Sequence, residues 1–167
     1  MAFDWHARFR QQSGWTRELR AYLYQKAGLN KAERVLEVGC GTGAILVELA
    51  TRKSLHIHGL DIDPLRLAKA QSHTPALFTC GDALALPYPG NAFDITFCHY
   101  LLLWVKDPLH ALVEMKRVTC PGGYILAMAE PDYSQRVDKP ESLAVTLWSV
   151  KELLVFPSRF VPSLRHW

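Results

Sequence analysis

Short apolar runs alternate with longer segments of helical periodicity along the chain. The runs, which we expect to be strands, cover residues 34–38, 55–60, 76–80, 93–98 and 124–129. The expected helices cover residues 16–28, 44–51, 64–72, 108–118 and 142–156. Strands that are apolar throughout are typical of parallel sheets covered on both faces. The pattern therefore predicts one α/β domain with a doubly wound, mainly parallel sheet.

Composition narrows the function without identifying it. The chain has 167 residues, of which 49% are hydrophobic and 21% charged, as in an average soluble protein. The net charge of +3 comes from interspersed basic and acidic residues, which disfavours a nucleic-acid partner. No apolar stretch reaches the roughly 18 residues of a membrane span, and residues 1–10 carry no signal-peptide core. We therefore expect a cytoplasmic protein.

The four cysteines give no sign of a metal site. They form no CxxC pair and no zinc-binding spacing, so we expect four buried thiols and no bound metal. They are Cys40, Cys80, Cys98 and Cys120.

Glycines follow the first expected strand at alternate positions, in Gly39-Cys-Gly41-Thr-Gly43. Glycines allow a sharp turn and let a ligand approach the main-chain amides, and the next helix begins here. A tight turn without any ligand explains the glycines equally well. The GxGxG spacing also differs from the GxGxxG of dinucleotide-binding proteins.

Acidic residues follow the next two strands. Asp61 ends the second, where a carboxylate can accept hydrogen bonds from both hydroxyls of a ribose. Asp63 precedes Pro64 and is expected to cap the following helix. Asp82 and Ala83 follow the third strand, where a carboxylate and a backbone N–H can contact an adenine edge. Ligands of such sheets bind at the carboxyl ends of the strands, so these residues are predicted to share a cleft.

Five segments together carry a family resemblance. They are Val35-Leu-Glu-Val-Gly-Cys-Gly-Thr-Gly43, Gly59-Leu-Asp61, Gly81-Asp-Ala-Leu-Ala-Leu-Pro87, Asn91-Ala-Phe-Asp94 and Arg117-Val-Thr-Cys-Pro-Gly-Gly123. In order and spacing, residues 30–130 resemble the class I S-adenosylmethionine-dependent methyltransferases. They are most similar to the small-molecule group that includes the ubiquinone/menaquinone-biosynthesis enzymes.

The resemblance implies a cofactor, S-adenosylmethionine, and a set of residues that bind it. Glu37 and the glycine loop would hold the methionine portion, Asp61 the ribose, and Ile62, Asp82 and Ala83 the adenine. Cys98 and His99 would line the methionine side. The full set of implied cofactor-binding residues is Glu37, Gly39, Cys40, Gly41, Gly43, Asp61, Ile62, Asp82, Ala83, Cys98 and His99. Residues 1–29, including Trp15 and Thr16, would form a helical lid, residues 30–130 the cofactor-binding core, and residues 131–167 a shortened C-terminal part.

The implied reaction transfers a methyl group to a small-molecule acceptor and needs mainly alignment and exclusion of water. A base matters only if the acceptor must lose a proton. His99, Tyr100 and Tyr133 are the candidates, although packing explains them more simply, so no catalytic residue is assigned. An aromatic acceptor pocket is conceivable, but we expect core positions for Trp104, Trp148, Phe156, Phe160 and Trp167.

The chain departs from the family at its C-terminal end. Five strands are expected where the family usually has seven, so the C-terminal β-hairpin is predicted to be missing. The fifth strand would then be an exposed edge through which the protein associates into a homo-oligomer. The alternative function is a truncated, catalytically weak S-adenosylmethionine-binding protein. A more remote alternative is an NAD(P)-dependent oxidoreductase, which GxGxG argues against.

Overall fold

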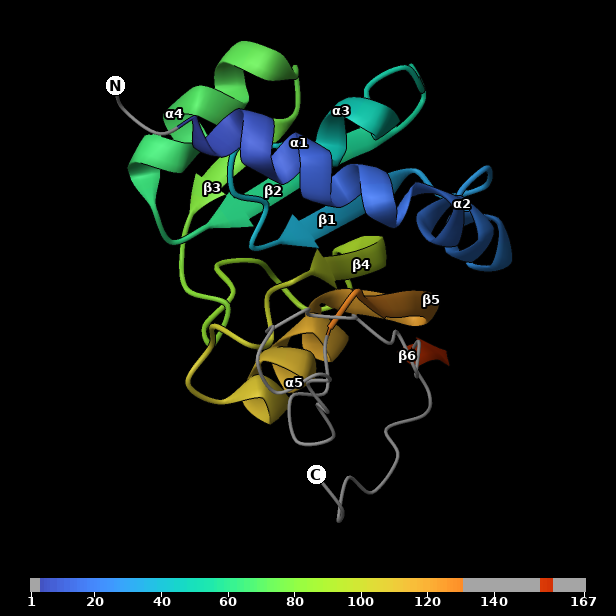
Figure 1. Cartoon of the computed structure of the whole chain (residues 1–167). Helices are drawn as coiled ribbons and strands as arrows, with labels where there is room; N and C mark the ends of the chain where they lie inside the picture. Colours follow the sequence, from blue (N-terminus) through green and yellow to red (C-terminus); the bar gives the residue numbers. More distant parts are fainter. Residues whose placement is uncertain (1–3, 131–153, 158–167) are drawn as a thin grey trace, which may run out of the picture.

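The computed structural model describes residues 4–130 and 154–157. Their strands form one six-stranded sheet in the order β3-β2-β1-β4-β5-β6 (Figure 1). The strands are β1 Arg34–Val38, β2 His56–Asp61, β3 Leu77–Cys80, β4 Phe93–His99, β5 Thr119–Met128 and β6 Leu154–Pro157. The first five are parallel and β6 is antiparallel to β5. The predicted fold class, a doubly wound and mainly parallel sheet, is therefore confirmed.

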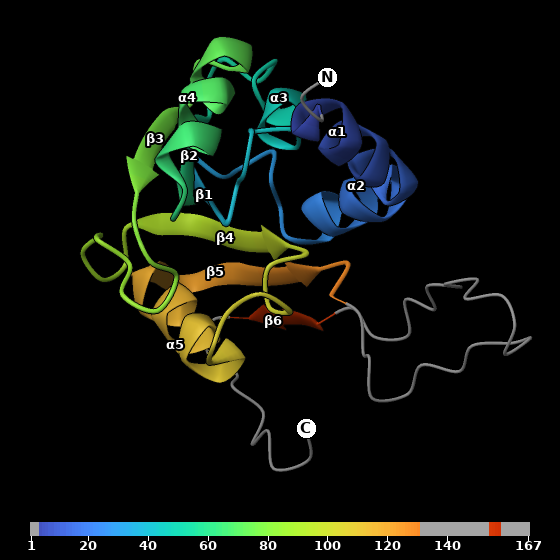
Figure 2. The ribbon, with the colours of Figure 1, turned by 60° about the vertical axis from the view of Figure 1, so that its left-hand side comes forward.

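Helices cover both faces of the sheet (Figure 2). They are α1 Trp5–Trp15, α2 Arg17–Lys26, α3 Leu46–Leu49, α4 Pro64–His73 and α5 Pro108–Val118. In the two ribbon views, α1 to α4 lie on one side of the sheet and α5 lies on the other. Among the described residues, none of these helices is long and apolar enough to cross a membrane.

Two buried clusters explain why the strands are apolar along their whole length. On one face, Leu23 of α2 and Leu46 of α3 pack with Phe97 of β4. On the other face, Met115 of α5 packs with Leu36 of β1 and the rest of its cluster. The strands β1, β2, β4 and β5 therefore bury side chains on both faces, as a parallel sheet with helices on each side requires.

Aspartate caps set the starts of α4 and α5. Asp63 Oδ1 accepts hydrogen bonds from the amides of Leu65 and Arg66, which confirms the predicted cap. Asp107 Oδ1 accepts from the His110 amide in the same way. Both helices have proline next to the cap, where a missing N–H costs nothing.

The C-terminal end of the sheet differs from the expectation. Residues 154–156, predicted to end a helix, lie in β6, which pairs with Tyr124–Ala127. The expected exposed edge of the fifth strand is therefore covered over these residues. The turn expected at 121–123 falls within the bounds of β5, next to a register shift opposite Phe93 and Ile95. The remainder of the expected helix, residues 142–153, lies outside the described residues.

The cysteine prediction is correct only in part. Cys40 and Cys98 are buried, Cys120 is half-buried and Cys80 is exposed. The four buried thiols that were expected are thus two. Cys80 is exposed because it lies at the end of β3, the edge strand of the sheet.

Candidate functional site

A cavity of about 840 Å³ opens at the carboxyl ends of the central strands. Its floor is formed by the ends of β1, β2, β3 and β4, its roof by α1, and one wall by residues 99–106. The volume is near the upper end of the range for small-molecule sites. The predicted residues that line it are Glu37, Gly39, Cys40, Gly41, Asp61, Ile62, Asp82, Ala83, His99 and Tyr100.

The glycine loop after β1 is held by hydrogen bonds to β2. The amides of Gly39 and Cys40 donate to the Leu60 carbonyl oxygen at 2.7 and 2.9 Å. The Gly41 amide donates to Asp61 Oδ2 at 2.7 Å. Gly39 has a φ of +75°, and a Cβ there would lie 2.6 Å from Leu101 Cδ1. The loop therefore needs glycine for its backbone and its close packing, and these three amides are already engaged within the protein.

Asp61 is buried at the end of β2 and is fixed by the same loop. Besides the Gly41 amide on Oδ2, its Oδ1 accepts from the Asp63 amide at 3.0 Å. Each carboxylate oxygen can accept more than one hydrogen bond, so Asp61 keeps capacity for hydroxyl donors from the cavity. The carboxylate is thus held in place by the backbone and remains able to bind a ligand.

Glu37 carries the most unusual side chain of the cavity. It is 2% exposed, and its Oε2 has no hydrogen-bond partner within the described part of the chain. Burial raises the pKa of Glu37 well above its ordinary value, Arg20 opposes this rise and Asp61 adds to it. A buried carboxyl without a partner costs free energy unless something else satisfies it. A cationic ligand group in the cavity would do so.

Beyond Asp61, the ends of β2 and β3 bring apolar side chains and a second carboxylate to the cavity. Ile62 is 69% exposed, Ala83 is buried and Asp82 is exposed. Asp82 Oδ1 accepts from the Leu84 amide at 2.9 Å, which fixes the turn after β3. An exposed isoleucine next to a carboxylate offers a surface for stacking and an acceptor for an amino group.

Helix α1 covers the cavity above the glycine loop and lies within residues 1–29, which were expected to form a helical lid. Of the α1 residues that line the cavity, Trp15 was named in that expectation, whereas Trp5 and Phe9 were not. A Cβ on Gly41 would lie 3.5 Å from the Phe9 ring, and His6 Nδ1 is 2.8 Å from Thr42 Oγ1. The ring centroids of Trp5 and Phe9 are 5.8 Å apart. The available signal was this aromatic pair four residues apart, which places both rings on one side of a helix.

Two predicted cofactor-binding residues do not line the cavity. A Cβ on Gly43 would face Ala70 and Thr74 of the α4 region, at 3.2 and 3.3 Å. Cys98 is fully buried, and its Sγ lies 3.5 Å from Glu130 Oε1. Side chains alternate along a strand, so Cys98 and the next residue, which does line the cavity, point to opposite faces.

The three candidate bases have different outcomes. His99 lines the cavity, and burial, assisted by the nearby Arg20 charge, lowers its pKa to about 3. Tyr100 also lines it and adopts the left-handed backbone conformation, with a φ of +54°. Such a φ is uncommon for an aromatic residue and indicates local strain. Tyr133 lies outside the described residues.

The prediction that Trp104 belongs to the core is wrong. It is 78% exposed and lines the cavity with Trp5 and Trp15. It belongs to the segment after β4, which carries it away from the sheet and its buried clusters. Trp148, Phe160 and Trp167 lie outside the described residues, and for Phe156 the structure describes only its place in β6.

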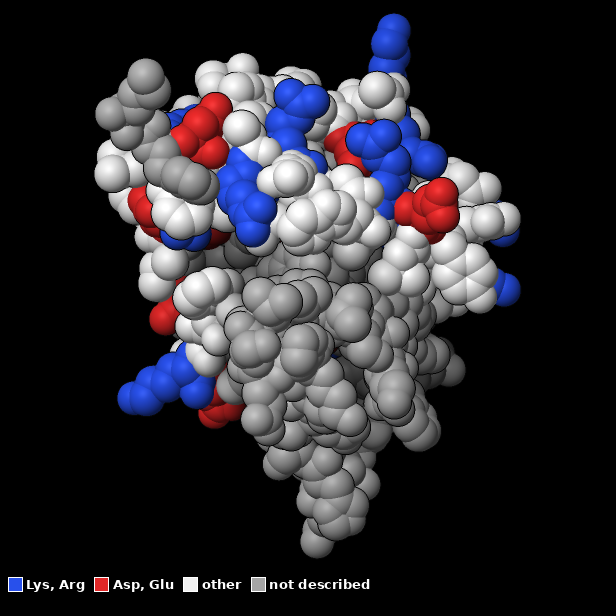
Figure 3. Space-filling model, in the orientation of Figure 1, with Lys and Arg blue, Asp and Glu red and all other residues white. Residues whose placement is uncertain are grey.

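Basic side chains also line this cavity, whereas the outer surface carries mixed charge. Arg8, Arg66 and Lys106 contribute to the lining. Figure 3 shows basic and acidic residues intermixed on the face that it presents. On this face the basic residues are thus interspersed with acidic ones.

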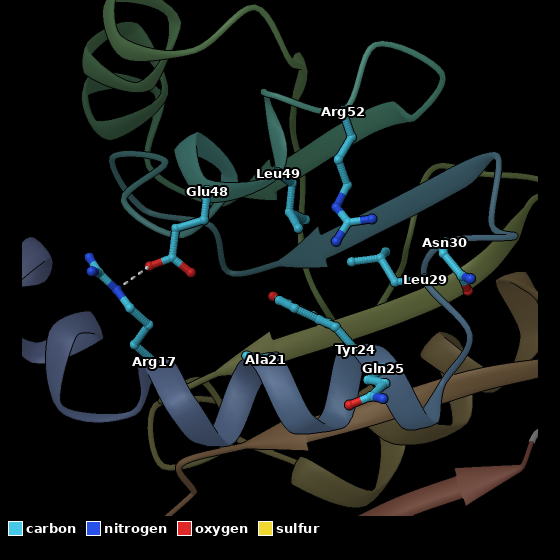
Figure 4. A pocket seen from close by; sticks show the side chains of 9 residues that line it. All are labelled: Arg17, Ala21, Tyr24, Gln25, Leu29, Asn30, Glu48, Leu49 and Arg52. Atoms are coloured by element: carbon cyan, nitrogen blue, oxygen red, sulfur yellow. Dashed lines mark ion pairs between the residues drawn. The ribbon is translucent and has the colours of Figure 1, made fainter.

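A second cavity, of about 510 Å³, lies beside α2 and α3 (Figure 4). Glu48 points toward Arg17 there, with 3.8 Å between Glu48 Oε1 and Arg17 Nε. Tyr24 contributes a buried hydroxyl that has no hydrogen-bond partner among the described residues. None of the predicted site residues lines this cavity, so the site is assigned to the larger one.

Comparisons with known proteins agree with this fold. Residues 36–127 match a family described as "Methyltransferase domain". A demethylmenaquinone methyltransferase of Deinococcus radiodurans is 36% identical over 124 residues, which cover 71% of this chain and 50% of that protein. A malonyl-[acyl-carrier protein] O-methyltransferase of Halorhodospira halophila is 36% identical over 98 residues, covering 56% of this chain and 33% of that protein.

A solved structure with similar sequence has the same fold. The [4+2]-cyclase SpnF is 32% identical with a TM-score of 0.59, and the match covers 66% of this chain and 43% of that chain. The chain thus spans half or less of the length of the three proteins named here. None of the three is an oxidoreductase.

Proposed function

Since this chain belongs to the methyltransferase domain family, we propose that it binds S-adenosylmethionine in the large cavity and transfers its methyl group to a small molecule. The observation that carries the proposal is the buried Glu37 carboxyl at the floor of the cavity, whose Oε2 has no hydrogen-bond partner among the described residues. S-adenosylmethionine has an α-ammonium group, so the residue and the ligand satisfy each other. The fit rests on this orphaned side chain.

Each part of the cavity has a complementary role in this proposal. Glu37 would accept a hydrogen bond from the ligand ammonium group, and Asp61 would accept from the ribose hydroxyls. Ile62 would pack on the adenine ring, while the Asp82 carboxylate would accept from its amino group. When bound, S-adenosylmethionine supplies a methyl group that is activated by a positively charged sulfonium. The chain's own contribution is alignment and exclusion of water by the α1 aromatic side chains.

The acceptor would enter at the end of the cavity formed by α1 and residues 99–106. Trp15 and Trp104 are exposed there, and Arg8 and Lys106 bring positive charge. This combination suits a flat or apolar small molecule that carries negative charge. A nucleic acid is a poor fit because basic and acidic residues are interspersed along the sequence and on the face in Figure 3.

We also propose a cytoplasmic location and self-association, in which β6 rather than β5 would supply the edge.

Two measurements on the full chain test the proposal. Calorimetry with S-adenosylhomocysteine, the demethylated product, should show one site per chain. Incubation with S-adenosylmethionine and a panel of small anionic and neutral acceptors should then release S-adenosylhomocysteine only with an accepted compound. Failure of the folded chain to bind either adenosyl compound would contradict the proposal. Binding without transfer to any acceptor would favour the catalytically weak binding protein.

A further inference from the structure

A buried arginine in α2 controls the hydrogen bonding next to the cavity. Arg20 is fully buried, and its Nη2 and Nε donate to the Glu48 carboxylate at 2.6 and 3.2 Å. Glu48 is the same residue that Figure 4 shows paired with Arg17. Arg20 Nη1 donates to the Ser13 carbonyl oxygen and to Thr16 Oγ1, each at 2.6 Å.

The direction of these bonds determines where the Thr16 proton lies. A guanidinium only donates, so Thr16 Oγ1 accepts from Arg20 and retains its own proton for another acceptor. Two acceptors are in reach, namely His99 Nε2 at 2.8 Å and the Ser13 carbonyl oxygen at 3.4 Å. The Ser13 oxygen already accepts from Arg20 Nη1 and from the Thr16 amide, which occupy its two lone pairs. The Thr16 hydroxyl therefore donates to His99 Nε2.

A neutral imidazole that accepts at Nε2 carries its proton on Nδ1. We propose that the Arg20–Thr16 pair holds His99 as this tautomer, so that Nδ1–H is a fixed hydrogen-bond donor for an oxygen atom of a ligand in the cavity. His99 lines the cavity, and its Nδ1 makes no hydrogen bond to the described part of the chain. The ligand in this proposal follows from the proposed function.

The cavity needs such a donor. A ligand with an amino-acid portion brings a carboxylate, and a charged acceptor binds a neutral N–H strongly. The amides of Gly39, Cys40 and Gly41, which would be the obvious donors, already bond to protein oxygens. The oxygen on the Nδ1–H can belong to this carboxylate or to the methyl acceptor. In either case His99 binds and orients a ligand and does not act as a general base.

Nuclear magnetic resonance of the full 15N-labelled chain tests the tautomer without any ligand. Long-range 1H–15N spectra should show a protonated Nδ1 and an unprotonated Nε2 for His99, assigned by comparison with His99→Asn. Thr16→Val removes the hydroxyl donor and should abolish this preference, whereas Thr16→Ser keeps the hydroxyl and should preserve it. Equal melting temperatures of the two variants show that the fold is retained. A proton on Nε2 in the wild-type chain overturns the proposal.

Two variants of His99 test the donor. Asparagine places an amide N–H close to the Nδ1 position, whereas glutamine reaches toward the Nε2 position. His99→Gln should weaken a ligand that uses the donor by about 10-fold or more, and His99→Asn should restore most of the affinity. S-adenosylhomocysteine and 5′-methylthioadenosine, which lacks the amino-acid portion, are the probes, together with the KM of an accepted methyl acceptor.

The outcomes separate the sources of the oxygen. A loss confined to S-adenosylhomocysteine assigns the donor to the carboxylate, and a raised acceptor KM with unchanged affinity for both probes assigns it to the acceptor. Equal behaviour of the Asn and Gln variants in every measurement overturns the donor role. If the wild-type chain binds neither adenosyl probe, the proposed function fails, while the spectrum still decides the tautomer.

Discussion

Glu37→Gln should weaken cofactor binding while making the ligand-free protein less sensitive to pH. The substitution preserves shape and removes only the charge of a carboxyl that is 2% exposed and has an unpartnered Oε2 among the described residues. A hydrogen bond between charged groups contributes about 1.5–3 kcal/mol. The dissociation constant of S-adenosylhomocysteine should therefore rise by roughly 10- to 150-fold.

The raised pKa of Glu37 adds a second, independent signature. In the ligand-free fold the native state holds a proton that the unfolded chain has released, so the unfolding free energy falls as pH rises above the ordinary Glu value. Glu37→Gln should flatten this decline. An ammonium group that binds next to Glu37 favours the charged carboxylate, so binding to the wild-type chain should release protons and should weaken at lower pH.

Isothermal titration calorimetry in two buffers with different ionisation heats measures both quantities. The wild-type chain should release a fraction of a proton per ligand, and Glu37→Gln should release fewer. Glu18→Gln, an exposed position in the first turn of α2, is the matched control and should change neither value. Wild-type affinity and proton release in Glu37→Gln would refute the assignment of the ammonium group to this carboxyl.

Two further predictions concern Asp61, which lines the cavity, and Glu130, which holds the segment after β4 that forms one wall. Asp61→Asn retains an acceptor for the Gly41 amide but loses the negative charge. Calorimetry should therefore show that S-adenosylhomocysteine binds roughly 10-fold or more weakly to this variant. An unchanged affinity would contradict the ribose role of Asp61. Glu130 accepts from the Leu101 and Leu102 amides, and burial raises its pKa to about 7 from the ordinary 4.5. Denaturant unfolding should therefore show wild-type stability falling between pH 5 and pH 8 by up to about 3 kcal/mol from this group, and Glu130→Gln should reduce the decline.

The order of the central helices and strands was predictable because proline, glycine and capping residues mark many of their boundaries. Pro108 and the apolar spacing of the next turns predicted α5 with its observed bounds. Asp63 and Pro64 likewise fixed the start of α4. The five parallel strands were predicted within a few residues, except that β5 begins at Thr119 and not at Tyr124. The sixth strand, β6, was missed because residues 154–156 were expected in a helix. The early start depends on pairing with β4 across an irregular register, which no local pattern encodes.

The position of the site followed from topology, whereas its electrostatics did not. Residues after parallel strands meet at one edge, so Asp61 and Asp82 were expected to share a cavity, and they do. The state of Glu37 depends on the absence of a partner in space, which a sequence cannot reveal. Arg20 looks like an exposed helix residue in the sequence, yet it is fully buried because Glu48 and two oxygens near the end of α1 surround its guanidinium.

Glu37 is the one buried carboxyl among the described residues with an unpartnered oxygen, and its place on the cavity wall is a physical argument for the use of this cavity. Buried polar groups are normally satisfied and bulky residues normally avoid a positive φ, yet Glu37 and Tyr100 break these rules on the wall of the same space. Other polar groups are satisfied within the fold, since Asp63 caps its helix and Thr96 and Thr119 pair their hydroxyls inside the core at 2.7 Å. The remaining buried side-chain atoms without a partner in the described part are neutral hydroxyls, those of Tyr24, Thr74 and Tyr88, which cost less free energy than a carboxyl. A protein that maintains a buried carboxyl without a partner at this point loses stability in the ligand-free state. A bound cation that pairs with the carboxylate would recover this free energy as affinity. Replacing the Glu37 carboxyl should therefore raise the stability of the ligand-free protein and weaken ligand binding.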